Sequence, residues 1–159
     1  MRIRGSLMAA ASLLLISCGS EPKPAAVPQP VQPAEVSKPP DESRRFPPPN
    51  LVGTKVVNDH LLGKAFMPGG TLAHYKKGKL DYEMFLAKLA TPTDAAILLP
   101  DWRKALADVK PVPSFGGLFG SDGGRPVFVF TKGAWMLGIA GLNEQDADQQ
   151  GRVLAGRVN

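Results

Sequence analysis

The chain has one cysteine, Cys18, and two histidines, His60 and His74, among its 159 residues. A single cysteine excludes a disulfide within the chain. Neither histidine belongs to a metal-binding spacing, such as two histidines on one helical face with a glutamate between them. Asp59 precedes His60, but neighbouring residues point in different directions in regular structure. The sequence therefore predicts no metal site, no cofactor and no catalytic constellation.

Long apolar runs and a charged face of one sign are also missing. The longest apolar stretch, residues 7–16, has about half of the ~20 residues that cross a bilayer. The net charge is +5, but lysines and arginines are interspersed with aspartates and glutamates. A phosphate-binding face needs a continuous basic stripe, so the charge pattern argues against nucleic-acid binding.

The first seventeen residues have the features of a signal peptide. Arg2 and Arg4 precede the short apolar run, an order typical of an export signal that is removed and not of a permanent transmembrane helix. The run ends at Leu15-Ile16-Ser17-Cys18. This sequence resembles the lipobox of bacterial lipoproteins.

The resemblance implies cleavage between Ser17 and Cys18 and acylation of Cys18. Two or three acyl chains make a stable membrane anchor. Gly19, instead of an aspartate, follows the cysteine, which in a two-membrane bacterium implies an outer-membrane location facing the periplasm. In a bacterium with one membrane, the protein would lie on its outer face. The alternative is an ordinary signal peptide with an incidental cysteine.

Residues 18–49 are interpreted as the lipidated cysteine and a proline-rich linker. Ten prolines lie between Gly19 and Pro49. Because proline lacks an N–H and fixes φ, we expect no sheet or helix here but a disordered tether with little apolar mass to bury. About thirty such residues reach up to about 90 Å when fully extended. Residues 50–159 remain for one small domain.

Patterns within residues 50–159 predict strands and helices. Strand signals occupy residues 51–57, 72–75, 80–86, 112–119, 126–131 and 134–142, with a glycine turn at 76–79. Helix starts follow at Thr91 and Asn143. Two apolar faces have helical spacing: Ala95, Leu99, Trp102 and Leu106, and then Ala147, Gly151, Leu154 and Val158. Pro100 is expected to kink or split the first helix.

This order predicts an α+β domain. We expect an antiparallel sheet of about five strands with two helices packed on one face, in ββα-βββα order. A signal helix and the disordered proline-rich tether would precede it. The two halves are loosely similar without a residue-level repeat. The small residues Ala147 and Gly151 would let the last helix lie close against the strands.

The stretch from Gly116 to Arg125 contains five glycines. Their exposed amides could hold an anion, although the Lys-Ser/Thr of a phosphate-binding loop is missing and the stretch joins two strands. A bulged hairpin loop that needs positive φ angles explains the same glycines. The candidate ligand or partner contacts are Gly117, Gly120, Asp122, Gly123 and Arg125.

Further candidates have weaker signals. Lys76, Lys77 and Lys79 form either a solvated turn or a contact with anionic lipids or wall polymers. Ser114 and Ser121 lack the context of a nucleophile elbow. The larger aromatic residues are expected in the core, and any exposed together on the open sheet face would mark a binding surface. They are Phe85, Trp102, Phe115, Phe128, Phe130 and Trp135.

Two functions are consistent with these patterns. The first is a membrane-anchored, non-enzymatic binding or scaffolding module of the cell envelope, with an unknown envelope protein or cell-wall component as partner. It predicts an apolar or aromatic patch on the sheet face opposite the helices. The alternative is a small ligand-binding or hydrolytic domain that uses residues 116–125 with His60 or His74. That function requires these groups to converge in one pocket.

Overall fold

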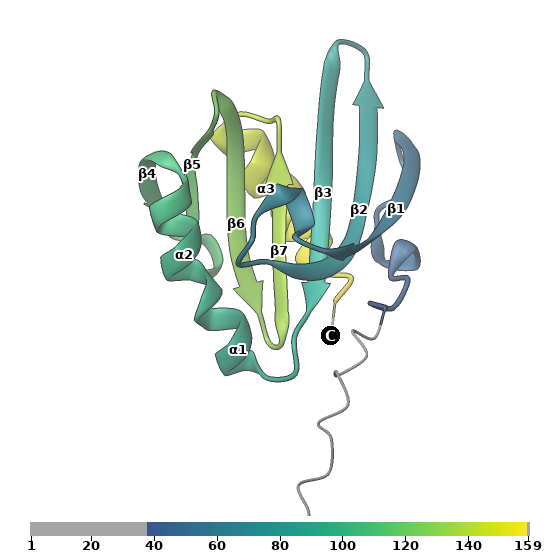
Figure 1. Cartoon of the computed structure of the whole chain (residues 1–159). Coiled ribbons are helices and arrows are strands. Elements are labelled where there is room, and N and C mark those ends of the chain that lie inside the picture. The colour runs from purple at the N-terminus through teal and green to yellow at the C-terminus, as the bar shows by residue number, and fades with distance from the viewer. Residues whose placement is uncertain (1–37, 159) are drawn as a thin grey trace, which may run out of the picture. The chain divides into compact units, whose positions relative to one another are not determined.

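The computed structural model describes residues 38–158 (Figure 1). They belong to one compact unit, residues 36–159. The expected signal peptide (1–17), the lipidated Cys18 and residues 19–37 of the expected tether lie outside the described residues. Among the described helices, none is long and apolar enough to cross a membrane.

Seven antiparallel strands form one sheet in the order β1-β2-β3-β7-β6-β5-β4. Their bounds are β1 Leu51–Asp59, β2 Pro68–Lys77, β3 Leu80–Lys88, β4 Ala107–Val112, β5 Gly117–Asp122, β6 Arg125–Lys132 and β7 Trp135–Ala140. Strands β1–β3 and β4–β7 are two meanders that meet where β3 pairs with β7. The α+β class is therefore confirmed, but with seven strands in place of about five and with three and four strands before the helices, in place of the expected ββα-βββα order.

The glycine turn at 76–79 predicts a hairpin, and the hairpin is present. Lys77 pairs with Leu80, so Gly78 and Lys79 form a two-residue loop between β2 and β3. Gly78 has a φ of +60°, a conformation that glycine adopts without strain. The tip of this hairpin projects beyond the neighbouring strands at the top of Figure 1. The strand expected over residues 51–57 is β1, which lies at one edge of the sheet.

The single strand expected over residues 112–119 is wrong in its bounds, because Val112 ends β4 and only residues 117–119 belong to β5. Strand β4 ends at Val112, and the 3-10 turn η3 (Ser114–Gly116) follows it. Phe115 has a φ of +59°, so the chain turns there and cannot continue as a strand. The additional strand β4 contains Pro111, which is tolerated because β4 is an edge strand.

The first helix is split, as Pro100 predicts. Helix α1 spans Pro92–Ala96 and α2 spans Leu98–Ala105. A proline at position 100 has no N–H for the carbonyl of Ala96, four residues earlier, and its ring crowds that carbonyl. The break therefore falls directly after Ala96. Thr91 begins α1 with a reciprocal capping box.

Helix α3 (Glu144–Ala155) begins as the sequence predicts. The Asn143 side chain accepts a hydrogen bond from the Asp146 N–H, which caps the helix. Gly151 is buried, and a Cβ there would lie 2.8 Å from Cε1 of Phe128. A small residue at this position is therefore what allows α3 to lie close against the sheet.

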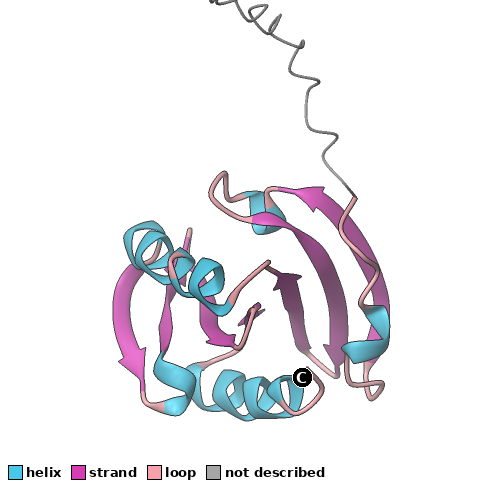
Figure 2. Cartoon of the chain, turned by 90° about the horizontal axis from the view of Figure 1, so that it is seen from below, coloured by secondary structure: helices cyan, strands magenta, loops and turns pink. Residues whose placement is uncertain are grey.

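The helices cover opposite faces of the sheet, which corrects the expectation of one helical face (Figure 2). In β6, Val129 belongs to the core cluster that contains Trp102 of α2. Its neighbour Phe128 belongs to the cluster that contains Leu154 of α3. Successive strand residues point to opposite faces, so both faces of the central strands are buried.

The positions of the helices exclude a twofold symmetry between the two halves of the domain. A twofold axis perpendicular to the sheet could exchange β3 with β7, because these central neighbours are antiparallel. Such an axis would keep both helical segments on one face. Since α2 and α3 pack on opposite faces, this symmetry does not relate the halves.

Residues 38–49, expected to belong to the tether, pack on the domain, and we call them the N-terminal arm. Phe46 is 2% exposed and lies in the core on the α3 face. The Tyr75 hydroxyl donates a 2.8 Å hydrogen bond to the carbonyl of Pro47. The folded part therefore includes residues that precede position 50.

Two arginines join the N-terminal arm to the end of α3. Arg45, in the short 3-10 turn η1 (Ser43–Arg45), donates to the carbonyl of Arg157 at 3.1 Å. Arg157 donates to the carbonyl of Arg45 at 2.7 Å. This reciprocal contact holds the arm beside the C-terminal end of the domain.

Candidate functional site

Two of the glycines that the sequence suggested as ligand contacts are packing residues. Gly117 and Gly120 lie in β5 and are buried. A Cβ at Gly117 would lie 2.6 Å from the Phe128 ring, and one at Gly120 would lie 2.8 Å from the carbonyl oxygen of Ala107. Both glycines are therefore needed for the close approach of β5 to its neighbours.

The other candidates in this stretch form a tight turn and two separate ion pairs. Gly123 has a φ of +58° in the turn between Asp122 and Arg125, the conformation expected for a hairpin loop. Asp122 Oδ1 lies 2.7 Å from Lys64 Nζ. Arg125 Nη1 lies 2.7 Å from Glu83 Oε2. The five candidate contacts are thus not gathered around one cavity.

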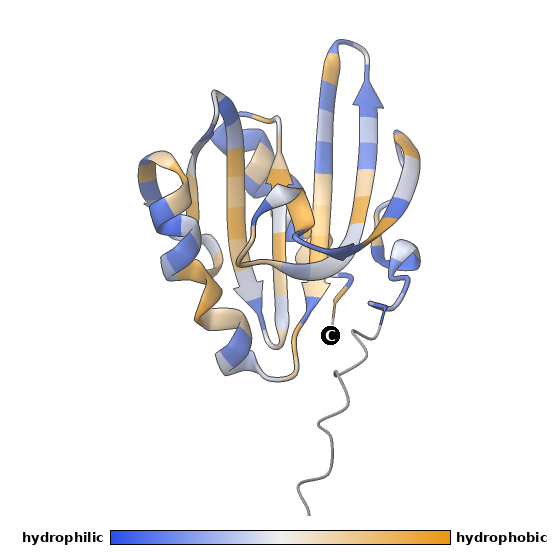
Figure 3. Ribbon diagram, in the orientation of Figure 1, coloured by the Kyte–Doolittle hydropathy of each residue, from blue (hydrophilic) through white to orange (hydrophobic). Residues whose placement is uncertain are grey.

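Arg125 does reach a polar part of the sheet that also contains His74. His74 Nε2 lies 2.8 Å from Asp81 Oδ1, and His74 is directly opposite Glu83 in the β2–β3 register. The four side chains line a shallow pocket of about 470 Å³. Figure 3 shows polar residues along the outer parts of β2 and β3. This open part of the sheet is a solvated charged surface and not the expected aromatic patch.

The remaining groups of the alternative function lie elsewhere. His60 follows β1 and has a left-handed backbone, and its Nδ1 lies 3.8 Å from Asp59 Oδ1. Ser121 is in β5, opposite Pro126. Within residues 38–158, no group of three or more acidic, histidine or cysteine side chains could hold a metal ion. A site built on residues 116–125 requires these residues and a histidine to meet in one pocket. Of the candidate groups, only His74 and Arg125 line the same pocket.

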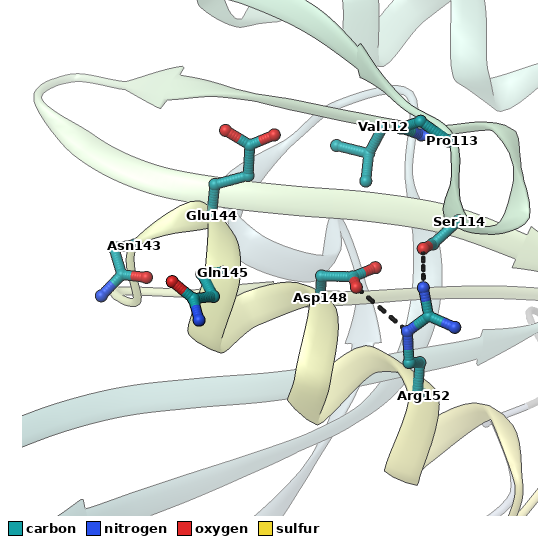
Figure 4. Close-up of a pocket in the computed structure, with 8 residues that line it drawn as sticks. All are labelled: Val112, Pro113, Ser114, Asn143, Glu144, Gln145, Asp148 and Arg152. Atoms are coloured by element: carbon teal, nitrogen blue, oxygen red, sulfur yellow. Dashed lines mark hydrogen bonds and ion pairs between the residues drawn. The ribbon is translucent and has the colours of Figure 1, made fainter.

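A different pocket lies between η3 and helix α3 (Figure 4). It has a volume of about 580 Å³. The side chains that line it come from the end of β4, the β4–β5 connection, the N-cap of α3 and the first three turns of α3: Val112, Pro113, Ser114, Asn143, Glu144, Gln145, Asp148 and Arg152. We call it the η3–α3 pocket.

Three polar side chains form a chain of contacts on one side of this pocket. Arg152 Nη2 donates to Ser114 Oγ, and Arg152 Nε donates to Asp148 Oδ2 at 3.0 Å. The Ser114 hydroxyl makes the largest contribution to holding the pKa of Asp148 below its usual value, and Arg152 makes a smaller one. Asp148 Oδ1 is buried and accepts no hydrogen bond from the described residues. The carboxylate is therefore ionised, with Oδ1 enclosed by the protein and Oδ2 on the more accessible side of a side chain that is 25% exposed.

Phe115 lies beside Ser114 and is the exposed aromatic residue of this turn. Its side chain is 40% exposed, although one face stacks on Phe130 with the ring centroids 4.7 Å apart. Its left-handed backbone costs about 1 kcal/mol or more for a residue with a Cβ. This strained turn holds a partly exposed aromatic ring next in sequence to Ser114, which lines the η3–α3 pocket.

Comparison of the chain with known protein families, curated proteins and solved structures finds no match. The candidate site therefore has to be interpreted from its own chemistry.

The η3–α3 pocket offers polar and aromatic groups that are suited to binding. The oxygen of Ser114 accepts from the Arg152 guanidinium, and its hydroxyl contacts the Asp148 carboxylate. Arg152 keeps further N–H donors, and Oδ2 of the partly exposed Asp148 side chain keeps a lone pair. A donor and an acceptor side by side match a peptide group, while Phe115 offers an apolar surface.

Sequence reasoning missed this pocket. It assigned Phe115 to the core and treated Ser114 only as a nucleophile without a partner. The i, i+4 spacing of Asp148 and Arg152 predicts their ion pair on α3. Nothing in the sequence predicts that Ser114, 38 residues before Arg152, meets that pair.

Proposed function

We propose that the protein is a cell-envelope lipoprotein, anchored by acylated Cys18, whose domain is a non-enzymatic module that binds a peptide segment of another envelope component. The anchor rests on the lipobox-like Leu15-Ile16-Ser17-Cys18 behind a charged start and a short apolar run. In a two-membrane bacterium, the residue Gly19 favours the outer membrane. The binding role rests on the η3–α3 pocket.

The observation that carries the binding role is the strained, exposed Phe115 next to the Ser114–Arg152–Asp148 contacts. Backbone strain at an exposed aromatic residue needs a compensating reason, and partner contact is a common one. Aromatic and arginine side chains are also the types that dominate binding energy at interfaces. The partner segment would pack an apolar side chain on Phe115 and pair its main chain with Arg152 and Asp148.

Site-specific photo-crosslinking in cells tests this binding site. A photoreactive residue at Gln145, which is exposed and lines the pocket, should give a discrete adduct identifiable by mass spectrometry. The matched control is Thr93, which is exposed on α1, beside α2 on the opposite face. We expect Arg152→Ala and Phe115→Ser each to remove the adduct at 145. Equal adducts at both positions, or an adduct that survives both substitutions, would contradict the proposed site.

The anchor is tested separately by metabolic labelling with palmitate. Wild-type protein and a Ser20→Ala control should incorporate label and sediment with membranes, because both retain the cysteine. Cys18→Ala should do neither. Labelling of the Cys18→Ala variant would show that the lipobox interpretation is wrong.

A further inference from the structure

Basic side chains gather around Trp135 at one end of the sheet. The Arg45 guanidinium lies 4.7 Å from the centre of the Trp135 ring, and Lys88 Nζ lies 5.5 Å from it. Lys132 pairs with Trp135 across the β6–β7 turn and donates to the carbonyls that end α3. Arg157 contacts the N-terminal arm at the same place.

This group carries a clear excess of positive charge. With Arg44 and Lys38 of the N-terminal arm, six cations lie at this end, and we call them the basic end: Lys38, Arg44, Arg45, Lys88, Lys132 and Arg157. The arm contributes two carboxylates, Asp41 and Glu42, and Glu42 is already paired with Arg45 at 2.6 Å. Arg44 and Lys88 are exposed and form no ion pair within the described residues. The excess charge is therefore accessible.

The basic end is also where the chain enters the folded domain. The N-terminal arm passes Thr71, whose hydroxyl contacts Pro40 and Glu42, and Thr71 pairs with Leu86 near the end of β3. The hairpin tip at Gly78 lies at the other end of the same strands (Figure 1). Of the two ends of the sheet, the basic end is the one joined to the segment that leads to Cys18.

We propose that the basic end docks on anionic lipid headgroups of the membrane that holds Cys18. This inference rests on the proposed anchor but not on the peptide-binding role. We assign a lipid surface as the partner of the basic end because the membrane is within reach. About twenty residues separate Cys18 from Lys38, and a chain of that length spans at most about 70 Å. The domain is confined to that distance from the lipid surface by its own connection.

Weak attraction is sufficient under this confinement. Confinement within about 70 Å of a surface gives an effective concentration on the order of millimolar, so an affinity in the millimolar range already gives substantial occupancy. Each lysine or arginine close to an anionic leaflet contributes roughly fivefold to partitioning, and salt screens the effect. Docking in this orientation would direct the charged hairpin tip away from the membrane.

Vesicle sedimentation tests the inference without the anchor. The chain from Gly19 onward contains the entire compact unit and lacks the acylated residue. At low salt, it should sediment with vesicles of phosphatidylcholine containing phosphatidylglycerol, and not with phosphatidylcholine alone. The double reversal Arg44→Glu/Lys88→Glu should weaken this binding at least tenfold. The control, Lys77→Glu/Lys79→Glu, changes the net charge equally at the hairpin tip and should weaken it less than about threefold.

The outcomes separate the inference from general electrostatics. An equal loss in both double variants would mean that net charge alone drives binding, and a larger loss at the hairpin would place the lipid contact at the other end. Either result, or no binding to anionic vesicles by the parent chain, overturns the inference. Circular dichroism reports whether both variants are folded, and only folded variants are compared. Palmitate labelling of the full chain reports on the anchor independently.

Discussion

Replacement of Phe46 tests whether the N-terminal arm belongs to the core. The side chain is 2% exposed and packs on the α3 face of the sheet. A buried phenylalanine side chain removes at least about 150 Å² from water, which corresponds to about 4 kcal/mol at roughly 25 cal/mol per Å². We therefore expect Phe46→Ala to lower the free energy of unfolding by about 3–5 kcal/mol. Phe115→Ala, at a 40% exposed side chain, should lower it clearly less.

Urea unfolding followed by tryptophan fluorescence measures both effects. Trp102 and Trp135 are buried on opposite sides of the sheet, so the signal reports on the whole domain. A chain that starts at residue 38 should match the longer chain in stability, whereas one that starts at residue 50 should lose at least as much as Phe46→Ala. If Phe46→Ala changes the free energy of unfolding by less than about 0.5 kcal/mol, the arm is not part of the core.

Three further perturbations have defined outcomes. Gly138→Ala would place a Cβ 2.4 Å from the Phe85 ring and should destabilise by about 1–3 kcal/mol or more, whereas Gly53→Ala, with open space around it, should be nearly neutral in the same urea assay. Burial raises the pKa of Tyr75 above its usual 10.0, so the unfolded chain loses this proton first. Stability is then unaffected below about pH 10 and falls as the pH rises further, which urea midpoints across pH 8–12 would detect. Thr91→Ala removes the α1 capping box and should cost about 0.5–2 kcal/mol in thermal unfolding.

Local signals in the sequence predicted the elements that depend on neighbouring residues. The β2–β3 hairpin follows from the glycine turn at Gly78, the caps at Thr91 and Asn143 mark the helix starts, and Pro100 marks the break between α1 and α2. In each case the determining contact lies within four residues. These features form in nearly any tertiary context, so a single sequence is enough to predict them.

The face covered by each helix depends on a pattern that the sequence does contain. All six residues of β7, from Trp135 to Ala140, are buried, and in β6 the run from Val127 to Phe130 is buried as well. Uninterrupted apolar strands indicate that both sheet faces are covered. One helical face would instead leave alternate positions of these strands polar. The opposite placement of α2 and α3 was therefore predictable, whereas β4, a short and mostly exposed edge strand with Pro111, has no such signal.

The candidate site depends on contacts that no local pattern contains. Ser114 meets Arg152 only because α3 crosses the face of the sheet on which η3 turns, and Gly151 sets how closely that helix approaches. An outward Phe115 requires the chain to leave β4 through a left-handed residue, which phenylalanine adopts rarely. An apolar residue at this position is expected in the core from its type alone. Its exposure follows from the packing of three distant segments, which is why the pocket was found in the structure and not in the sequence.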